Sequence, residues 1–488
     1  MSDLLPFLVA VPLLGALAPL VVGVGRPDAV GRVTAAVLLV HLGVAAAAVW
    51  GVVTGGALSY VVGGLPAAYG IGLRLDAVSS AFVLLVAVVS AAAHLAVRTD
   101  PTGPTDSLWL LLVAGLTGVC VTADVFNLYV FLEISGLAAY ALVASRRGAT
   151  AALAALNYLL AGTVGATLYL IGVGYAYVAT GTLSMATLRV ELAGAGYDSP
   201  LVVAAFVLVT LGLGVKIALF PVHGWKPDAY RAAPADVSVL LAALGSTVAG
   251  YALVRVTFDV FTASFLAAVP LVGAALTVIG LVSVVVGGYL TLRQTNLQRL
   301  FAYSSVLQFG LVVAGVGLAT PAAVTGALVL LLGHAVAKGS LFAAAGVFER
   351  RYGAKTLADY AGLGRESPVL GVSVAVLFAS LVGLPPTAGF AGKWYVALGA
   401  VASASWVAAA VVVLSTLLSL AYAGRIVERL FLAESDSAGV AVADGGPDDL
   451  SVRRAVALVA VAAGFVVVAG LTSTALSAWF APVVGGWL

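Results

Sequence analysis

The chain has 488 residues, of which 62% are hydrophobic and only 9% are charged, and its formal net charge is +2. Its mean hydropathy is +1.15. A soluble domain is about one quarter charged, and a soluble fold this apolar could not cover its surface with polar groups. The composition therefore excludes a soluble enzyme, a secreted disulfide scaffold and a nucleic-acid-binding protein, and it indicates a polytopic membrane protein.

Fourteen apolar runs are long enough to cross the lipid bilayer, for which about 20 residues are needed. The first run lacks an N-terminal Lys or Arg, so we interpret it as a retained helix and not as a cleaved signal peptide. We therefore expect an all-α polytopic membrane protein. The predicted spans are 4–24, 33–54, 78–97, 107–123, 125–144, 151–178, 200–222, 237–257, 268–290, 300–318, 322–347, 368–391, 404–424 and 455–472.

Basic residues are distributed unevenly between the loops on the two sides of the membrane. Seventeen of the 23 Lys and Arg residues fall in one set of alternate loops, and Arg98 and Lys226 are among them. Only Arg74, Arg189 and Arg255 fall in the opposite set. Because the basic excess marks the cytoplasmic side, both termini are expected outside and the acidic loop 433–454 inside.

Local cofactor motifs are absent from the sequence. Cys120 is the only cysteine, the four histidines form no metal-binding pair, and no GxGxxG, P-loop or CxxCH motif occurs. We therefore expect no cofactor, no metal site and no redox centre in this chain. Whether the chain belongs to an enzyme complex is left open by these observations.

Charged residues inside the predicted spans are the first functional candidates. Lys216, Lys338 and Lys393 are three of only five lysines, and each lies in or beside a span. A central charge costs about 2.5–3.5 kcal/mol, although a lysine near a helix end can instead reach the interface. Glu133 is the only acid in 125–144, and it would be protonated in hydrocarbon unless a lysine lay nearby. A Glu–Lys contact that opens and closes would be a proton switch, whereas a static ion pair would only hold two helices together.

A second pair of candidates lies within one span. His334 and Lys338 are four residues apart, so they share one face of a helix. A histidine changes its charge near neutral pH, so a histidine beside a lysine predicts a proton relay. The alternative is a histidine that is simply hydrogen-bonded.

Two spans contain breaks. The first break, in the seventh span, holds Pro221 and His223 and continues to Asp228. The second, in the twelfth span, holds Pro385 and Pro386. A proline removes a backbone donor, and such breaks are tolerated at membrane depth where they line a cavity. Matching breaks in two halves of a chain indicate a transport site.

The positions of the breaks predict two inverted five-span repeats, spans 4–8 and 9–13, in which each broken span is the fourth of its repeat. The resulting parts are an N-terminal region 1–106, a first repeat 107–257, a second repeat 268–424, an acidic cytoplasmic linker 425–454 and a C-terminal helix 455–488.

Five segments resemble the antiporter-like membrane subunits shared by respiratory complex I and Mrp-type Na⁺/H⁺ antiporters. The resemblance covers roughly residues 60–430. The first segment is especially similar to the D-type subunit of Mrp antiporters, whereas the last is close to the N-type subunit of quinone oxidoreductases. The segments are DVFNLYVFLEISGLAAYALVA (124–144), KIALFPVHGWKPDAYRAAPADVS (216–238), RLFAYSSVLQFG (299–310), GHAVAKGSLFAAAG (333–346) and GLPPTAGFAGKWY (383–395).

The resemblance implies a role for each matched charge. Glu133 and Lys216 would be a coupled carboxylate–lysine pair, His334 and Lys338 would carry protons along a central polar axis, and Lys393 would exchange protons with the outer side. It also implies a prokaryotic cell membrane, other membrane subunits as partners in one complex, and protons and Na⁺ as the transported ions.

The sequence departs from the family pattern on this axis. Thr247 stands where the family usually has a lysine, Gln308 stands where a histidine is common, and Lys226 replaces an apolar residue. Ser246 and Tyr251 are polar neighbours of Thr247, and a buried water needs at least two polar partners. We hypothesise a hydrated gap at Thr247, with His334 and Lys338 taking over the relay.

Three functions remain open at this stage. The first is a proton-translocating subunit of an Mrp-type monovalent cation/proton antiporter, favoured by segment 124–144. The second is a proton-pumping subunit of NADH:quinone oxidoreductase or a related membrane hydrogenase, favoured by segment 383–395. The third is a scaffold that has lost transport, for which Thr247 and Gln308 are the only support. The coupling ion among Na⁺, Li⁺ and K⁺ also stays open.

Overall fold

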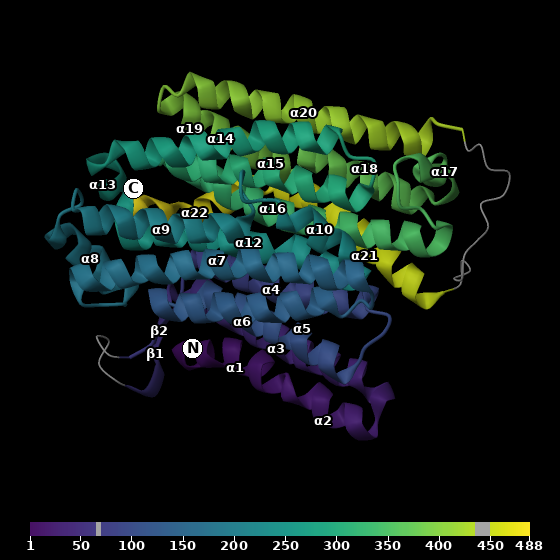
Figure 1. The fold of residues 1–488 in the computed structure, drawn as a ribbon, viewed down its shortest axis with the longest axis horizontal. Coiled ribbons are helices and arrows are strands. Elements are labelled where there is room, and N and C mark those ends of the chain that lie inside the picture. The colour runs from purple at the N-terminus through teal and green to yellow at the C-terminus, as the bar shows by residue number, and fades with distance from the viewer. Residues whose placement is uncertain (65–69, 435–448) are drawn as a thin grey trace.

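The protein is described by a computed structural model that covers residues 1–64, 70–434 and 449–488. Its long helices lie side by side along one direction (Figure 1). Within these residues, thirteen helices are long and apolar enough to cross a membrane, and a bent pair formed by Ala358–Glu366 and Pro368–Val382 gives a fourteenth span. The expected polytopic all-α fold with about 14 spans is confirmed.

The N-terminal region contains three spans and a small hairpin. Its elements are η1 (Ser2–Leu4), α1 (Leu5–Gly15), α2 (Leu17–Gly25), η2 (Pro27–Ala29), α3 (Val30–Gly55), β1 (Leu58–Val61), η3 (Val62–Gly64), β2 (Gly72–Leu75) and α4 (Ala77–Val97). The strands β1 and β2 pair antiparallel, with Leu58 opposite Leu75. Helices α1 and α2 together make the first span.

The region of the predicted first repeat contains more elements than the hydropathy profile shows. They are α5 (Gly103–Val121), α6 (Val125–Ala144), α7 (Ala149–Thr180), α8 (Met185–Ala195), α9 (Pro200–Ile217), α10 (Trp225–Ala232), α11 (Ala235–Leu240), η4 (Leu241–Gly245), α12 (Ser246–Arg255), η5 (Val256–Phe261) and α13 (Thr262–Ala268). The last five form one span, in which η4 and η5 are π-helical turns.

The region of the predicted second repeat and the C-terminal part complete the chain. Their elements are α14 (Pro270–Leu292), α15 (Leu297–Leu318), α16 (Pro321–Tyr352), η6 (Ala358–Tyr360), α17 (Leu363–Glu366), α18 (Pro368–Val382), α19 (Ala388–Ala402), α20 (Trp406–Phe431), α21 (Leu450–Leu471) and α22 (Ser473–Trp487). Helix α20 extends into the expected linker 425–454, of which residues 435–448 lie outside the described residues.

Polar side chains at the first residues of several helices explain where those helices begin. Asp76 accepts hydrogen bonds from the amides of Val78 and Ser79 at the start of α4. Asp124 accepts one from the amide of Asn127 at the start of α6, over 2.7 Å. Such caps satisfy amides that have no partner within the helix. The short boundary that the sequence predicts at Asp124, between two spans, is therefore present.

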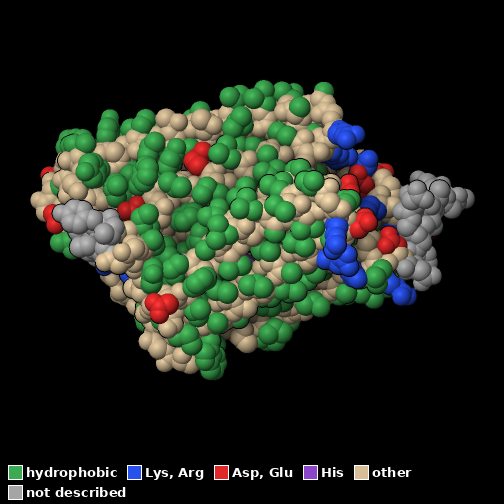
Figure 2. Space-filling model, turned by 90° about the horizontal axis from the view of Figure 1, so that it is seen from below, with side chains coloured by type: hydrophobic (Ala, Val, Ile, Leu, Met, Phe, Trp, Pro, Cys, Tyr) green, Lys and Arg blue, Asp and Glu red, His purple; other side chains and the backbone are tan. Residues whose placement is uncertain are grey.

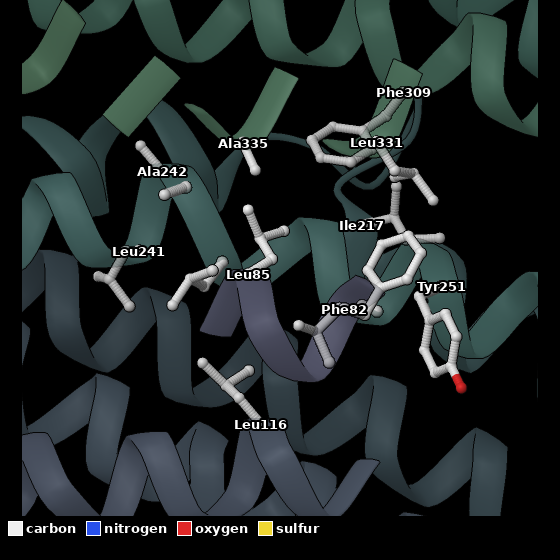
Figure 3. Close-up of a cluster of buried hydrophobic side chains, with 14 of the residues drawn as sticks. Phe82, Leu85, Leu116, Ile217, Leu241, Ala242, Tyr251, Phe309, Leu331 and Ala335 are labelled. Carbon is white, nitrogen blue, oxygen red and sulfur yellow. The ribbon is translucent and has the colours of Figure 1, made fainter. Parts of the chain in front are cut away.

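The share of each span that is buried within the chain identifies the centre of the bundle. It reaches 94% in Ala235–Ala268 and 89% in both α15 and α16, but only 28% in Ser2–Gly25 and in α21. Figure 3 shows side chains of α4, α9 and α16, among them Phe82, Ile217 and Leu331, packed within this centre. A charge on one of the central spans is therefore held away from lipid.

Both termini lie toward the left end of the bundle in Figure 1, whereas α20 ends and α21 begins at the opposite end. On the face shown in Figure 2, Lys and Arg side chains gather at this second end, and hydrophobic side chains cover the middle. The termini therefore share one end, as the sequence predicts. Which side of the membrane each end faces stays a prediction.

Three basic residues that hydropathy assigns to loops have buried side chains, and two of them lie on helices, Arg255 on α12 and Lys226 on α10. The side chains of Arg98 and Arg255 are 5% and 7% exposed, and Lys226 is 0% exposed. Their neighbours explain the difference. Arg255 pairs with Asp76 over 2.6 Å and with Asp259 over 2.8 Å, contacts that a loop count based on hydropathy does not consider.

These arginines tie separate helices together. Arg98 follows α4 and pairs with Asp106 of α5 and with Asp236 of α11, while His94 of α4 lies 3.1 Å from the carboxylate of Asp106. Breaking a buried pair by removing one partner leaves an uncompensated charge, which is strongly destabilising. Arg98 and Arg255 therefore fix the span Ala235–Ala268 against the N-terminal region.

We predict that cysteines placed at Asp3 and Glu434 react from opposite sides of the membrane, with Asp3→Cys labelled from outside. The basic asymmetry of the loops is the physical reason. The measurement is one-sided labelling with an impermeant maleimide in right-side-out vesicles. The wild-type chain is the matched control, because its only cysteine, Cys120, is 2% exposed. Labelling of both positions from the same side would contradict the topology.

Candidate functional site

A carboxylate–lysine contact joins two helices. Lys216 lies in the last turn of α9 and its Nζ donates a hydrogen bond of 2.7 Å to Oε1 of Glu133, which lies on α6. The two side chains are 11% and 21% exposed, respectively. The structure thus brings together the two residues that the sequence pairs across 83 positions. Their role in transport stays a prediction.

Close packing of small residues leaves room for this contact. Lys216 also donates to the hydroxyl of Tyr140 over 3.2 Å. A Cβ atom on Gly136 would lie 3.0 Å from both the Lys216 Nζ and the Tyr140 hydroxyl, and a Cβ on Gly162 of α7 would collide with that hydroxyl. Glycines on α6 and α7 are therefore needed for Tyr140 and Lys216 to meet.

Aromatic rings continue from Tyr140 to the first break. The Tyr140 and Tyr158 rings meet edge to face at 4.5 Å, and the Tyr158 and Trp225 rings stack at 4.1 Å. Nε1 of Trp225, the first residue of α10, donates to the carbonyl of Val215 over 3.0 Å. These ring contacts and this hydrogen bond hold the start of α10 against the last turn of α9.

The first break begins directly after Lys216. Helix α9 ends at Ile217, and Ala218 has a left-handed φ of 67°, which costs a non-glycine residue about 1–3 kcal/mol. The chain then passes through Pro221 to His223, which is 9% exposed and packs against the ring of Tyr303 at 5.9 Å. The predicted break in the seventh span is therefore present, and it is packed against α15.

Asp228 lies apart from these buried groups. Its carboxylate accepts a hydrogen bond of 2.8 Å from Arg299 of α15, and the two side chains are 47% and 29% exposed. Exposed ion pairs contribute little to stability. Asp228 thus joins α10 to α15 near the surface, and its predicted part in gating stays a prediction.

Lys226 is the residue of this region that sequence reasoning missed. It lies on α10, it is fully buried, and its Nζ donates to the carbonyl of Ile217 over 3.1 Å. The Nζ lies 4.5 Å from the centre of the Phe309 ring. The sequence did contain one indication of its importance: this chain has a lysine where the family usually has an apolar residue.

His334 and Lys338 lie on α16 in the centre of the bundle, as expected. The Nζ of Lys338 donates to the carbonyl of Phe301 over 2.8 Å and also to the hydroxyl of Ser304. The ring of His334 packs against Phe309 at 4.8 Å. Within the described residues, neither ring nitrogen of His334 has a hydrogen-bond partner, and its part in a relay stays a prediction.

The second break holds the last predicted lysine. Helix α18 ends at Val382, Pro385 and Pro386 follow in the connection, and Lys393 lies on α19. Lys393 is only 4% exposed, and its Nζ donates to the carbonyl of Val382 over 3.0 Å. Gln308 donates to the neighbouring carbonyl of Leu381 over 2.8 Å. Lys393 is therefore held inside the chain and does not extend to the membrane interface.

Thr247 lies on α12, where its side chain carries no charge. It is fully buried, and its hydroxyl has no hydrogen-bond partner among the described residues. Ser246 donates to the carbonyl of Lys216 over 3.2 Å. The hydroxyl of Tyr251 donates to the carbonyl of Cys120 and points away from the cluster (Figure 3). Tyr251 is thus already engaged elsewhere, and a hydrated gap at Thr247 stays a hypothesis.

Possible metal ligands do not gather in residues 1–64, 70–434 and 449–488. No group of three or more His, Cys, Asp or Glu side chains is placed there to hold a metal ion.

The pattern of two broken spans with buried lysines can be compared with known proteins. The sequence profile described as "NADH:quinone oxidoreductase/Mrp antiporter, TM" matches residues 122–419, which include Glu133, Lys216, both breaks and Lys393. The chain belongs to this family. It is an antiporter-like, multi-pass membrane subunit of the complex I/Mrp type.

Curated relatives of two kinds are similar to this family member. An N-type subunit of NADH-quinone oxidoreductase from Desulforudis audaxviator is 42% identical over 88% of this chain and 87% of its own length. A D-type subunit of a Na⁺/H⁺ antiporter from Bacillus subtilis is 32% identical over 78% of each chain. The two names correspond to the two kinds of assembly that the sequence leaves open.

Solved structures cover the full length of the chain. A chain of the membrane-bound sulfane sulfur reductase, described as an archaeal respiratory membrane complex, superposes with a TM-score of 0.89 and 27% identity, covering 100% of this chain and 98% of its own. A chain of the Mrp complex from Dietzia gives a TM-score of 0.85 and 25% identity, covering 100% and 97%. The arrangement of spans is therefore that of this family.

We predict that Gly162→Ala lowers the thermal unfolding temperature, because its Cβ would displace the Tyr140 hydroxyl that Lys216 contacts. Gly174 of the same helix is the matched control, since a Cβ there meets nothing within 4 Å. Gly174→Ala should leave stability unchanged or raise it by up to about 1 kcal/mol. Equal unfolding temperatures for the two variants would show that Tyr140 is not confined as described.

Proposed function

We propose that this chain is a proton-translocating subunit of a multi-subunit assembly in a prokaryotic cell membrane, and that the Glu133–Lys216 contact is its switch. The 2.7 Å contact between these side chains carries the proposal. Both residues lie on spanning helices, and each is the other's partner in an ion pair. Ionisable residues in such positions are rare and mark ion pathways in membrane proteins.

The contact can act as a switch because each charge is compensated only while the two side chains meet. When they meet, the carboxylate and the ammonium stabilise each other. When they separate, each loses the opposite charge that compensates it, and the proposed switch is the release of one proton by Lys216 and the binding of one by Glu133. The protonation states of two such groups are coupled and belong to the pair. Movement of α9 relative to α6 would therefore move a proton.

The lysines and the histidine of the second half would continue the proton path beyond the Glu133–Lys216 pair. Lys338 is held by a backbone carbonyl and a hydroxyl, and Lys393 by a carbonyl. None of these partners is a carboxylate, so neither lysine is held in its charged form by an opposite charge. His334 lies one helical turn from Lys338. We infer that His334 and Lys338 pass the proton toward Lys393.

The primary candidate for the assembly is an Mrp-type monovalent cation/proton antiporter. The segment that contains Glu133 resembles the D-type subunit of such antiporters, and the chain of the Dietzia Mrp complex covers the whole protein. Protons and Na⁺ would be the exchanged ions, and the other membrane subunits of the complex would be the partners. The lipid bilayer surrounds the apolar middle of the bundle (Figure 2).

The second candidate is a proton-pumping subunit of a NADH:quinone oxidoreductase or a related redox complex. The 42% identity to an N-type subunit, against 32% to a D-type subunit, favours it. The driving reaction would then take place in other chains. Inverted vesicles that contain the native complex separate the two candidates. Na⁺ addition should release protons from acid-loaded vesicles for the first, whereas NADH should acidify the vesicles for the second.

We predict that Glu133→Ala and Lys216→Ala each reduce proton translocation by at least tenfold in such vesicles, because each residue loses the partner that sets its protonation state. Co-purification of the other subunits reports whether the complex still assembles. Lys355→Ala is the control, since the Lys355 side chain is 60% exposed and pairs with Glu349, not with Glu133. If either core variant assembles and keeps wild-type translocation, the pair only holds α6 against α9.

A further inference from the structure

Lys226 is a buried cation without a carboxylate partner. It is 0% exposed, and within the described residues no carboxylate lies at ion-pair distance from its Nζ. Its polar contact is the carbonyl of Ile217, at 3.1 Å, and aromatic rings of Phe309 and Tyr230 lie 4.5 Å and 5.7 Å away. A buried lysine that is not paired with an acid can exist as a neutral amine and can therefore exchange a proton.

The same arrangement occurs at the second break. Ile217 is the last residue of α9, and Lys226 reaches its carbonyl from α10. Val382 is the last residue of α18, and Lys393 reaches its carbonyl from α19 over 3.0 Å. Carbonyls at a helix end lack partners within the helix and carry partial negative charge. Lys226 is therefore the structural counterpart of Lys393, although the two lie 167 positions apart and in different sequence contexts.

Lys226 also contacts a residue beside the switch and a residue beside the central relay. On one side its contact is Ile217, which directly follows Lys216. On the other side it faces the Phe309 ring, and that ring packs against His334 at 4.8 Å. Figure 3 shows Phe309, Leu331 and Ile217 in the same buried cluster. Among the described residues, no other lysine both donates to the carbonyl of Ile217 and lies over the Phe309 ring.

We propose that Lys226 carries protons between Lys216 and the His334–Lys338 pair. This inference rests on the proposed function and adds a carrier to the proposed path. One proton passes from the ammonium of Lys216 to the neutral amine of Lys226, which becomes an ammonium. The same proton then leaves Lys226 for the imidazole of His334 or the amine of Lys338. No bond other than N–H is formed or broken.

The proposal also accounts for Thr247. Ser246, its neighbour, donates to the carbonyl of Lys216, and Lys226 donates to the next carbonyl, that of Ile217. The start of α12 and the side chain of Lys226 thus meet the same last turn of α9. A threonine cannot hold a proton at neutral pH, whereas a lysine can. A lysine on α10 therefore supplies a carrier that position 247 lacks.

The competing account is that Lys226 only caps the end of α9. A helix-capping cation needs charge and a donor, which arginine also provides, but arginine does not release its proton in proteins. Lys226→Arg therefore separates the two roles. A carrier predicts loss of transport in this variant, and a cap predicts that transport is kept.

The experiment uses the native complex in inverted vesicles and follows proton translocation with a pH-sensitive dye. We expect Lys226→Leu and Lys226→Arg to reduce the rate at least tenfold. We expect the double variant Lys226→Leu/Thr247→Lys to recover at least a third of the wild-type rate, because it returns a lysine to the same turn of α9. Lys355→Leu is the control for loss of a lysine that lies on the surface.

The outcomes separate this inference from the proposed function. Loss in Lys216→Ala together with a wild-type rate in Lys226→Leu or Lys226→Arg overturns the role of Lys226 and leaves the switch intact. Absence of any proton translocation by the wild-type complex overturns both. If Lys226→Leu fails to assemble, Lys226→Gln replaces it, since glutamine keeps a donor toward Ile217 but neither gains nor releases a proton at neutral pH. A wild-type rate in that variant overturns the inference.

Discussion

The cost of placing a positive charge inside an apolar bundle is the constraint on which the rest of this structure depends. The chain meets it in two ways. Arg98 and Arg255 are compensated by carboxylates on other helices, which fixes them in place. Lys226, Lys338 and Lys393 are held by backbone carbonyls or a hydroxyl, which are weaker partners that bind both the ammonium and, less strongly, the amine. Lys216 differs from the other three lysines, because its partner is a carboxylate, that of Glu133 on α6. The arginines thus join helices through ion pairs, and three of the buried lysines are held by neutral groups.

The broken spans follow from the same constraint. A continuous helix uses its carbonyls internally, so it has none to offer to a neighbouring cation. Ending α9 at Ile217 and α18 at Val382 frees carbonyls at membrane depth, and the chain that returns after each break brings a lysine to them. The unfavourable left-handed conformation of Ala218 is part of this arrangement. In soluble proteins water can satisfy such helix ends, whereas here lysine side chains donate to these two carbonyls.

Much of this fold was predictable from local sequence. The span 125–144 matches α6 at both ends, since Asp124 caps it and apolar residues fill it. Glu133 and Lys216 were also identifiable, because a lone acid and a scarce lysine in apolar runs are conspicuous. The short helix α10 was not, since its eight residues are too few and too polar to register as a membrane element. For the same reason hydropathy places Lys226 in a loop. Its burial depends on the return of the chain between α7, α9 and α15, which is a tertiary property and leaves no periodic pattern in the sequence.

The π-helical turn η4 has a consequence for how residues on its span are compared between relatives. A π turn contains one residue more than an α turn for the same advance, so each residue after it is rotated by about 100° relative to an uninterrupted helix. Ser246 and Thr247 follow η4 directly. A wheel drawn from Ala235 with a period of 3.6 would therefore assign them to the wrong face. In a family member without that extra residue, the side chain that occupies the place of Thr247 in space would be one position away in an alignment. Two residues of this span in different relatives are therefore equivalent only if their side chains point in the same direction. That direction has to be taken from superposed structures before position 247 is said to have lost a lysine.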